Sequence, residues 1–295
     1  MTQPVHPIVV GVDGSAASHA ALRYACEEAE VRRLPLSLLH AWQPFPAFAG
    51  GTWSAEPFTL SPGEVERMAR RVLRHAAAIA GACAPDVRHE QHLVKKAPTG
   101  ALLEASESAL MVVVGGHGRA EDESGWVGPV PLRVAARARC PVIVVPSQPR
   151  LTGPVVVGVD GSGTSESALA FAFEEASRRR VPLRAVYAFS RGIAGARLDM
   201  HVFGNRGEEV LWHLSEALAG WREKYPDVAV EQLVSDEPAL RALRSSSPDA
   251  ALIVVGNGRG AVLRHGLGSV SSALLRTADC PVAVVGMVVR APIPV

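Results

Sequence analysis

Short apolar runs rich in valine and isoleucine alternate along the chain with longer segments whose apolar residues recur every three or four positions. The short runs are typical of buried β-strands, and the longer segments of helices packed on a sheet. This alternation predicts an α/β fold with a mostly parallel sheet covered on both faces. In the first half we expect strands at Ile8–Val12, Leu36–Trp42, Val87–Val94, Leu110–Gly115 and Val142–Val145, and helices at Ser18–Arg33, Glu64–Ala80, Gly100–Glu107 and Leu132–Ala138. In the second half we expect strands near Val155–Val159, Leu183–Ala188, Val228–Val234, Leu252–Gly256 and Val282–Val285.

The chain repeats itself once. Residues 8–15 read I-V-V-G-V-D-G-S, and residues 155–162 read V-V-V-G-V-D-G-S. The Cys-Pro-Val of residues 140–142 returns at residues 280–282. Between the copies, residues 146–150 are rich in proline and polar residues, as expected of a linker. We therefore predict two tandem domains, 1–147 and 152–295, each a doubly wound, Rossmann-like unit with a five-stranded parallel sheet.

Length, composition and charge bear on whether the protein binds nucleic acid or a membrane, and on the cell compartment in which it works. The length of 295 residues suits two domains, and 30 basic residues against 29 acidic ones give a net charge of +1, which favours neither nucleic acid nor an anionic membrane. The apolar runs are far shorter than the roughly 18 residues that span a bilayer, so no membrane partner is expected. The first strand begins almost at Met1, which leaves no room for a secretion signal. Four cysteines without C-x-x-C spacing favour free thiols in a reducing cytosol, so we expect a cytoplasmic protein.

Two further patterns have structural interpretations. Cys140 and Cys280 occupy equivalent places beside the last strand of each copy, and we expect buried, unreactive thiols there. Arg32-Arg33 and the run 178–180 fall at expected helix ends, where cations complement exposed carbonyl groups.

The loop after the first strand of each copy contains an Asp-Gly pair, Asp13-Gly14 and Asp160-Gly161, followed by serine. Two interpretations are open. The residues are common in turns and helix caps, where they satisfy backbone amides. Alternatively, the carboxylates accept hydrogen bonds from ribose hydroxyls or an adenine edge, because ligands of such sheets bind at the carboxyl ends of the strands.

Glycines cluster in the loop after the fourth strand. The first copy reads Gly115-Gly116-His117-Gly118, then nine residues, then Gly128-Pro129. The second reads Gly256-Asn257-Gly258, then nine residues, then Gly268-Ser269. A glycine loop leading into a helix exposes backbone amides that suit phosphate, although the glycines could equally serve only to permit turns. Neither loop is a P-loop, since no Gly-Lys-Ser/Thr follows.

Taken together, the V-G-V-D-G-S start, the glycine loop with its nine-residue spacer and the closing C-P-V-x-V-V strand resemble the universal stress protein family in its tandem two-domain form. The resemblance covers nearly the whole chain. It implies the strand order 3-2-1-4-5 in each domain, pairing of the domains through their last strands, and binding of an adenine nucleotide, ATP, with or without Mg²⁺. The resemblance leaves open whether two copies of the chain also form a homodimer.

The resemblance also implies roles for particular residues. In the second copy, Asp160 would meet the nucleoside, Ala188 would line the adenine pocket, and the ribose and phosphates would be held by Gly256, Gly258, Gly268 and Ser269. In the first copy the matching positions are Asp13, Ala41, Gly115, Gly118 and Gly128. The neighbouring Gly14, Gly161, His117, Arg259 and Val270 complete the set of candidate binding residues, and His117 is equally compatible with a solvated loop position.

The two copies depart from the family pattern differently. The first has Pro129 where the family has a hydroxyl residue, so a hydroxyl and an amide donor are missing, and its spacer carries Glu121, Asp122 and Glu123, which repel phosphate. The second keeps Ser269 and Ser271 and places Arg259, Arg264 and His265 in the spacer. We therefore expect the second domain to be the better nucleotide site.

The leading functional hypothesis is a cytosolic ATP-binding stress or regulatory sensor. No set of catalytic side chains stands out in the sequence. Two alternatives are open: a slow ATP hydrolase that uses a metal ion held by Asp13 or Asp160, and an interaction module that binds no nucleotide.

Overall fold

The computed structural model describes residues 6–43, 61–116, 127–188, 203–258 and 266–286. They form an α/β fold whose strands and helices alternate along the chain, as the apolar pattern predicts. Among these residues no helix combines the length and the apolar character needed to cross a membrane.

Within the described residues, each half of the chain contributes five strands. In the first half the elements are β1 (Ile8–Gly11), α1 (Ala16–Arg32), β2 (Leu36–Trp42), α2 (Pro62–Cys83), β3 (His89–Lys95), α3 (Pro98–Ala105), β4 (Met111–Gly115), α4 (Pro129–Arg137) and β5 (Val142–Val145). In the second half they are β6 (Val155–Val159), α5 (Gly163–Arg179), β7 (Leu183–Ala188), α6 (Phe203–Lys224), β8 (Val230–Ser235), α7 (Ala239–Ser245), the 3₁₀ turn η2 (Ser247–Asp249), β9 (Leu252–Gly256), α9 (Ser269–Thr277) and β10 (Val282–Val285).

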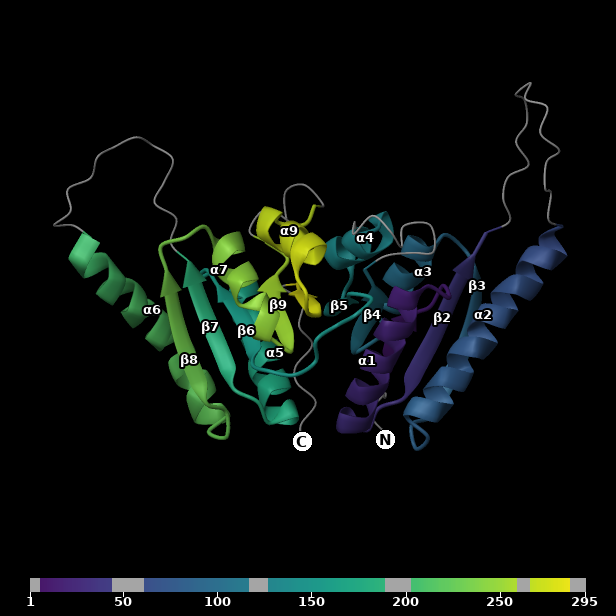
Figure 1. Ribbon diagram of the computed structural model, residues 1–295, viewed down its shortest axis with the longest axis horizontal. Helices are drawn as coiled ribbons and strands as arrows, with labels where there is room; N and C mark the ends of the chain where they lie inside the picture. The colour runs from purple at the N-terminus through teal and green to yellow at the C-terminus, as the bar shows by residue number, and fades with distance from the viewer. Residues whose placement is uncertain (1–5, 44–60, 117–126, 189–202, 259–265, 287–295) are drawn as a thin grey trace, which may run out of the picture.

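All ten strands join in one sheet, in the order β3-β2-β1-β4-β5-β10-β9-β6-β7-β8 (Figure 1). Each half therefore has the order 3-2-1-4-5, and its strands pair in parallel. The halves meet where β5 and β10 pair antiparallel, with Val282 opposite Val144 and Val284 opposite Val142. The last strands of the two domains thus form the seam of the molecule.

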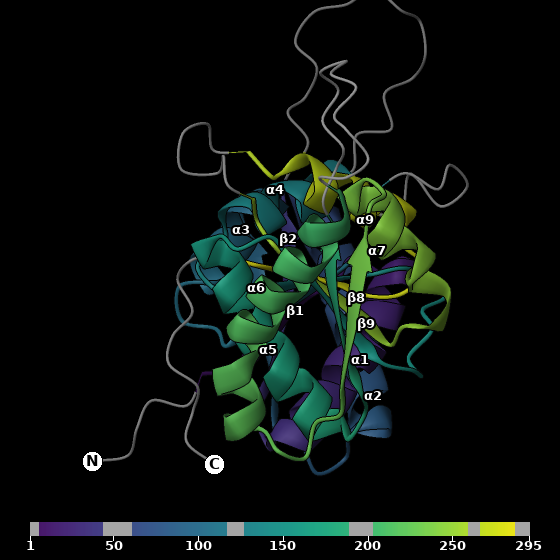
Figure 2. The same ribbon diagram turned by 90° about the vertical axis from the view of Figure 1, so that its left-hand side faces the viewer.

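Helices cover the sheet on both faces (Figure 2). One core layer joins the sheet to α1, α2, α5 and α6, through residues such as Leu22, Leu73, Phe173 and Leu214. The other joins it to α3, α4, α7 and α9, through residues such as Leu102, Val134, Leu243 and Leu274. Right-handed connections between parallel strands explain this division, because crossing from β3 to β4 carries the next helix to the opposite face.

The observed elements differ from the expected ones mainly at their starts. Three strands, β3, β4 and β8, begin later than the apolar pattern suggests. Before β3 and β8, Val87 and Val228 donate turn hydrogen bonds to the residue that directly follows the preceding helix. The first four helices begin two or three residues earlier than expected, for example α1 at Ala16 and α4 at Pro129. Serine caps and proline in the first helical position precede the periodic apolar residues, so they extend the helices on that side.

A buried group of charges joins α1 to α5 across the domain boundary. This α1–α5 ion cluster consists of Glu28, Arg32, Glu174, Glu175 and Arg179. The Arg32 side chain, only 3% exposed, bonds Glu28 of its own helix at 3.0 Å, Glu174 at 2.7 Å, and Glu175. In the reciprocal arrangement, Arg179 bonds Glu175 at 3.0 Å and also Glu28. The two arginines lie in the last helical turns as expected, but their guanidinium groups bond carboxylates of both domains.

Burial and charge act in opposite directions on the carboxylates of this cluster. Burial, with help from nearby Glu175, raises the pKa of Glu28. Burial would also raise the pKa of Glu175, but Arg32 and Arg179 outweigh it and hold that pKa below its usual range. A buried carboxylate stays ionised only where cations face it, and both carboxylates contact Arg32 and Arg179.

Candidate functional site

The predicted site residues gather at the carboxyl edge of the sheet. In each domain the first strand lies between the second and the fourth, so the strand order reverses there. The loops that follow these strands leave on opposite sides of the sheet and create the place where such folds bind ligands. In Figure 1 this edge carries α4 and α9.

The Asp13 loop is a capped turn in domain 1. Oδ1 of Asp13 accepts hydrogen bonds from the amide of Ser15 at 2.9 Å and from its hydroxyl at 2.7 Å. Ser15 in turn caps α1, because its Oγ accepts from the amide of Ser18 at 3.1 Å. Gly14 lies between them with a φ of 82°, a value that favours glycine. The turn interpretation is thus confirmed for Asp13. Its carboxyl also stands at the strand end, where a contact with a nucleotide stays a prediction.

Domain 2 builds the same turn. Oδ1 of Asp160 accepts from the amide of Ser162 at 3.0 Å and from its hydroxyl, and Ser162 caps α5 through the amide of Ser165. Gly161 has a φ of 71°. Asp160 is exposed whereas Asp13 is half-buried, so the carboxyl of domain 2 is the more open to a ligand.

Gly115 and Gly256 have a packing role that the sequence did not reveal. A Cβ at Gly115 would lie 2.6 Å from the backbone carbon of Ala17 and 2.8 Å from the amide nitrogen of Ser18. A Cβ at Gly256 would lie 2.7 Å from Oγ1 of Thr164. The first turn of α1 or α5 therefore rests directly on the end of the fourth strand. This close approach brings the Asp-Gly loop and the glycine loop together at one point.

The two ends of each glycine loop are tied together. The amide of Gly128 donates to the carbonyl of Gly116, and the amide of Gly268 donates to the carbonyl of Asn257, both at 2.9 Å. In domain 2 a Cβ at Gly258, whose φ is 103°, would lie 2.8 Å from Cα of Gly268. The loop is closed at its neck, and the helix that follows begins there.

The helices after these necks differ in their first turns. Gly128 and Gly268 are the N-caps of α4 and α9, and neither makes a side-chain cap hydrogen bond. The first three amides of a helix have no partner inside it, and they carry its positive end. In α9 these are the amides of Ser269, Val270 and Ser271, whereas α4 has Pro129, Val130 and Pro131 at the same places. Domain 2 therefore presents three amide donors and domain 1 presents one, because proline has none.

Sequence reasoning noted Pro129 but missed Pro131, although comparison of the two copies would have found it. Ser271 is the matching residue in domain 2, and the Ser271 hydroxyl donates to the carbonyl of Gly256 at 2.7 Å. This bond ties the first turn of α9 back to the end of β9.

Ala41 and Ala188 lie at the ends of β2 and β7, where their side chains pack against the core layer of α3, α4, α7 and α9. Small side chains at these strand ends leave room beside the Asp-Gly loops. His117, Gly118 and Arg259 lie outside the described residues, as do the charged spacer residues Glu121, Asp122, Glu123, Arg264 and His265.

Asn257 adds a polar atom that domain 1 lacks. Its Oδ1 is buried and has no hydrogen-bond partner within the part of the chain that the structure describes. Gly116 occupies the equivalent position in domain 1. A buried acceptor without a donor is costly, so this atom marks the domain 2 loop as the more polar of the two.

Known proteins with similar sequences place the chain in a family. The sequence model of the "Universal stress protein family" matches residues 4–146 and 152–286. The universal stress protein Rv2005c of Mycobacterium tuberculosis is 38% identical over 289 residues, covering 95% of this chain and 96% of the relative.

A solved structure of similar length shows the same fold. A universal stress protein of Archaeoglobus fulgidus superposes with a TM-score of 0.65 at 19% identity, covering 97% of this chain and 100% of that one. A shorter universal stress protein from Archaeoglobus fulgidus, solved in complex with dAMP, is 27% identical and covers 48% of this chain and 98% of its own, with a TM-score of 0.35. From its two family matches, its tandem relatives and its fold, the chain belongs to the universal stress protein family, as a member with two tandem domains.

Proposed function

We propose that the protein binds an adenine nucleotide, ATP, at the carboxyl edge of domain 2, and that it acts as a cytosolic regulatory or stress sensor. The observation that carries the proposal is the first turn of α9, which offers three backbone amides and the hydroxyl of Ser269 at the same edge of the sheet as the Asp160 loop. Amides at a helix start bind phosphate well, because the helix dipole adds positive potential.

The other residues of the edge fit the remaining parts of the nucleotide. The exposed Asp160 carboxyl is suited to accept hydrogen bonds from ribose hydroxyls, and Ala188 gives a flat base room at the end of β7. Gly258 and Gly268 allow phosphate to approach the backbone at the neck of the loop. Magnesium, where present, would be held by the phosphates and water. Each of these contacts binds or orients the nucleotide, which suits a sensor.

Domain 1 is the weaker site by the same argument. Two prolines remove two of the three amides from the first turn of α4. Each lost charge-assisted hydrogen bond to an anion costs about 1.5–3 kcal/mol, so the deficit corresponds to at least a tenfold weaker affinity.

The test is an equilibrium titration of the nucleotide-stripped chain with ATP and Mg²⁺, read as the number of sites per chain. We expect one site. The double substitution Ser269→Pro and Ser271→Pro gives α9 the first turn of α4 and should weaken that site at least tenfold. The reverse change, Pro129→Ser and Pro131→Ser, should strengthen binding in domain 1 and raise the number of sites toward two.

These paired variants are matched controls, since proline is tolerated in the first turn of a helix. Binding that survives the serine-to-proline change would show that the amides of α9 are not the phosphate site. Absence of any binding would favour an interaction module. Release of phosphate that is lost in Asp160→Ala would favour a hydrolase.

A further inference from the structure

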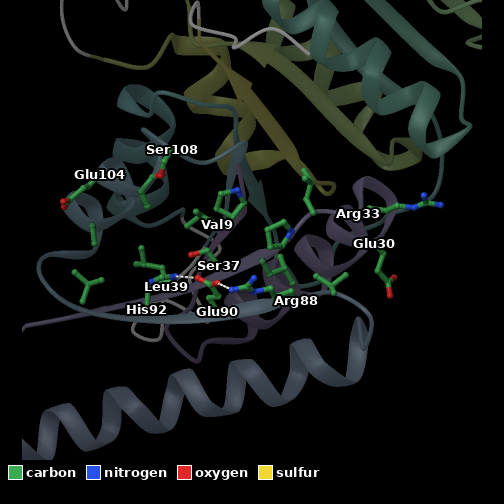
Figure 3. Close-up of a pocket in the computed structure, with 18 of the residues that line it drawn as sticks. Val9, Glu30, Arg33, Ser37, Leu39, Arg88, Glu90, His92, Glu104 and Ser108 are labelled. Atoms are coloured by element: carbon green, nitrogen blue, oxygen red, sulfur yellow. Dashed lines mark hydrogen bonds and ion pairs between the residues drawn. The ribbon is translucent and has the colours of Figure 1, made fainter. Parts of the chain in front are cut away.

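A cavity lies on domain 1, away from the carboxyl edge of the sheet. This β2–β3 cavity encloses about 1270 Å³ near the amino ends of β1, β2 and β3, on the face of the sheet that α3 covers in part (Figure 3). Its floor contains Val9, Ser37 and Leu39, and Glu90 and His92 project from β3 at its side. The volume is ample for a small organic ligand.

The equivalent place in domain 2 is filled. Arg184 stands on β7 in the register that Ser37 has on β2: Arg184 pairs with Val156 and Glu231, and Ser37 pairs with Val9 and Glu90. The guanidinium of Arg184 bonds Glu231 at 2.8 Å and Asp249 at 3.1 Å, and its side chain is only 20% exposed. Domain 2 therefore shows that the fold accommodates a guanidinium group at this position.

Domain 1 keeps the acidic partner and lacks the arginine. Glu90 occupies the place of Glu231, but its cation is Arg88, which lies next to it along β3 at 2.7 Å. The Arg88 side chain is 80% exposed, so it extends into solvent and does not fill the cavity. The other carboxylate oxygen of Glu90 lies 3.8 Å from Nε2 of His92.

The floor of the cavity also contains an unused polar group. Ser37 is 9% exposed, and its hydroxyl makes no hydrogen bond to any residue that the structure describes. A buried hydroxyl that opens into a cavity is a ready partner for a ligand donor. Val9, Leu39 and Ala101 surround it with apolar atoms, which suit a short alkyl chain.

We propose that the β2–β3 cavity binds a small alkylguanidinium compound, whose guanidinium bonds Glu90 and Ser37 in the place that Arg184 takes in domain 2. The alkyl chain lies along the apolar floor beside α3. The planar guanidinium matches a carboxylate with two parallel hydrogen bonds, which an ammonium cannot do. The site is independent of the nucleotide edge, so the proposal does not rest on the proposed function.

The test uses N-propylguanidinium, which reproduces the arginine side chain, in an NMR titration of the full chain. We expect saturable shifts of the amides of Val9, Ser37 and Leu39. The neutral isostere N-propylurea should bind at least about fivefold more weakly, because it lacks the positive charge that strengthens hydrogen bonds to a carboxylate. The substitution Glu90→Gln, at an exposed position, should weaken the binding of propylguanidinium to the same extent.

Two reciprocal substitutions use the internal repeat as a control. Ser37→Arg should fill the cavity from within and abolish the shifts, while ATP binding stays unchanged. Arg184→Ser should open the equivalent place in domain 2 and add a second set of shifts around Val156. The proposal is overturned if propylurea binds as well as propylguanidinium, if Ser37→Arg binds normally, or if no saturable shifts occur. If Arg184→Ser fails to fold, the comparisons with Glu90→Gln and with propylurea still test whether the cavity binds a guanidinium.

Discussion

Gly115 shows how one missing side chain fixes the distance between a helix and the sheet. Because a Cβ here would lie 2.6 Å from backbone atoms of α1, Gly115→Ala must push the helix start away from β4. Overpacking of this kind costs about 1–3 kcal/mol, and we expect the free energy of unfolding to fall by that amount. Chemical denaturation measures it.

Two glycines serve as controls for that substitution. Gly163→Ala adds a Cβ that meets nothing within 4 Å at the start of α5, so stability should stay within about 0.5 kcal/mol. Gly256→Ala should cost less than Gly115→Ala, because its nearest contact is the side chain of Thr164, which can move. Equal effects of all three changes would contradict the packing role.

These glycines also show where sequence reasoning stops. The pattern identified the positions and left two interpretations open, a permissive turn or a phosphate contact. Gly115 and Gly256 have ordinary negative φ values, and their requirement comes from the approach of another element. Gly14, Gly161 and Gly258 do need a positive φ, as a turn interpretation predicts. Contacts between distant segments leave no local signal in the sequence. Only the structure therefore distinguishes the glycines that are required by close packing from those that are required by a positive φ.

At the scale of elements, the strands were predicted best. Six of the ten, among them β9 and β10, have the bounds that the apolar runs predict, because a fully buried strand requires an unbroken apolar run. Helix starts were predicted late, because caps lie outside the apolar period. The pairing of α1 with α5 was not predicted at all, although Glu27-Glu28 and Glu174-Glu175 recur in the repeat. Charges at helix ends are usually solvated, and nothing local marks these as buried.

The α1–α5 ion cluster gives a pH-dependent prediction. The folded-state pKa of Glu175 lies below its ordinary value of 4.5, so its ionisation stabilises the fold above that pH and the benefit is lost as the pH falls through the folded pKa. Glu28 has the opposite sign: its raised pKa means that its contribution is lost as the pH rises through the folded value. Removing one partner of a buried ion pair costs about 3–5 kcal/mol. At pH 7, Glu175→Gln should therefore cost about 3 kcal/mol and Glu28→Gln clearly less.

The measurement is the unfolding free energy of both variants from pH 7 down to the lowest pH at which the chain stays folded. The difference between them should shrink once the pH falls below 4.5, because the benefit of ionised Glu175 is lost between that value and its lower folded-state pKa. Glu66→Gln removes an exposed ion pair with Arg70 and should change stability by less than about 1 kcal/mol at any pH. A constant difference across the range would exclude ionisation of Glu175 as its source.

At the scale of the whole molecule, the two domains differ in sites but share one sheet. The repeat in the sequence predicted two copies of one fold, and the pairing of β5 with β10 joins them without a break in the sheet. The buried ion cluster adds a second junction on one face of that sheet. Domain 1 has two prolines in the first turn of α4 and an open β2–β3 cavity. Domain 2 has serines at the matching places of α9, and Arg184 stands where the cavity would be.

A shared sheet should couple the stability of the two domains. If ATP binds domain 2 as proposed, a concentration of 100 times Kd stabilises the folded state by about 2.7 kcal/mol. Because unfolding of domain 1 exposes the seam strand β10 of domain 2 and breaks the ion cluster, part of this stabilisation should reach β1 and β4. Hydrogen exchange of their amides should therefore slow on adding ATP, and it should not slow in the Ser269→Pro, Ser271→Pro variant. Slowing confined to domain 2 would mean that the domains unfold independently in spite of their common sheet, and that domain 2 cannot report its nucleotide through this seam.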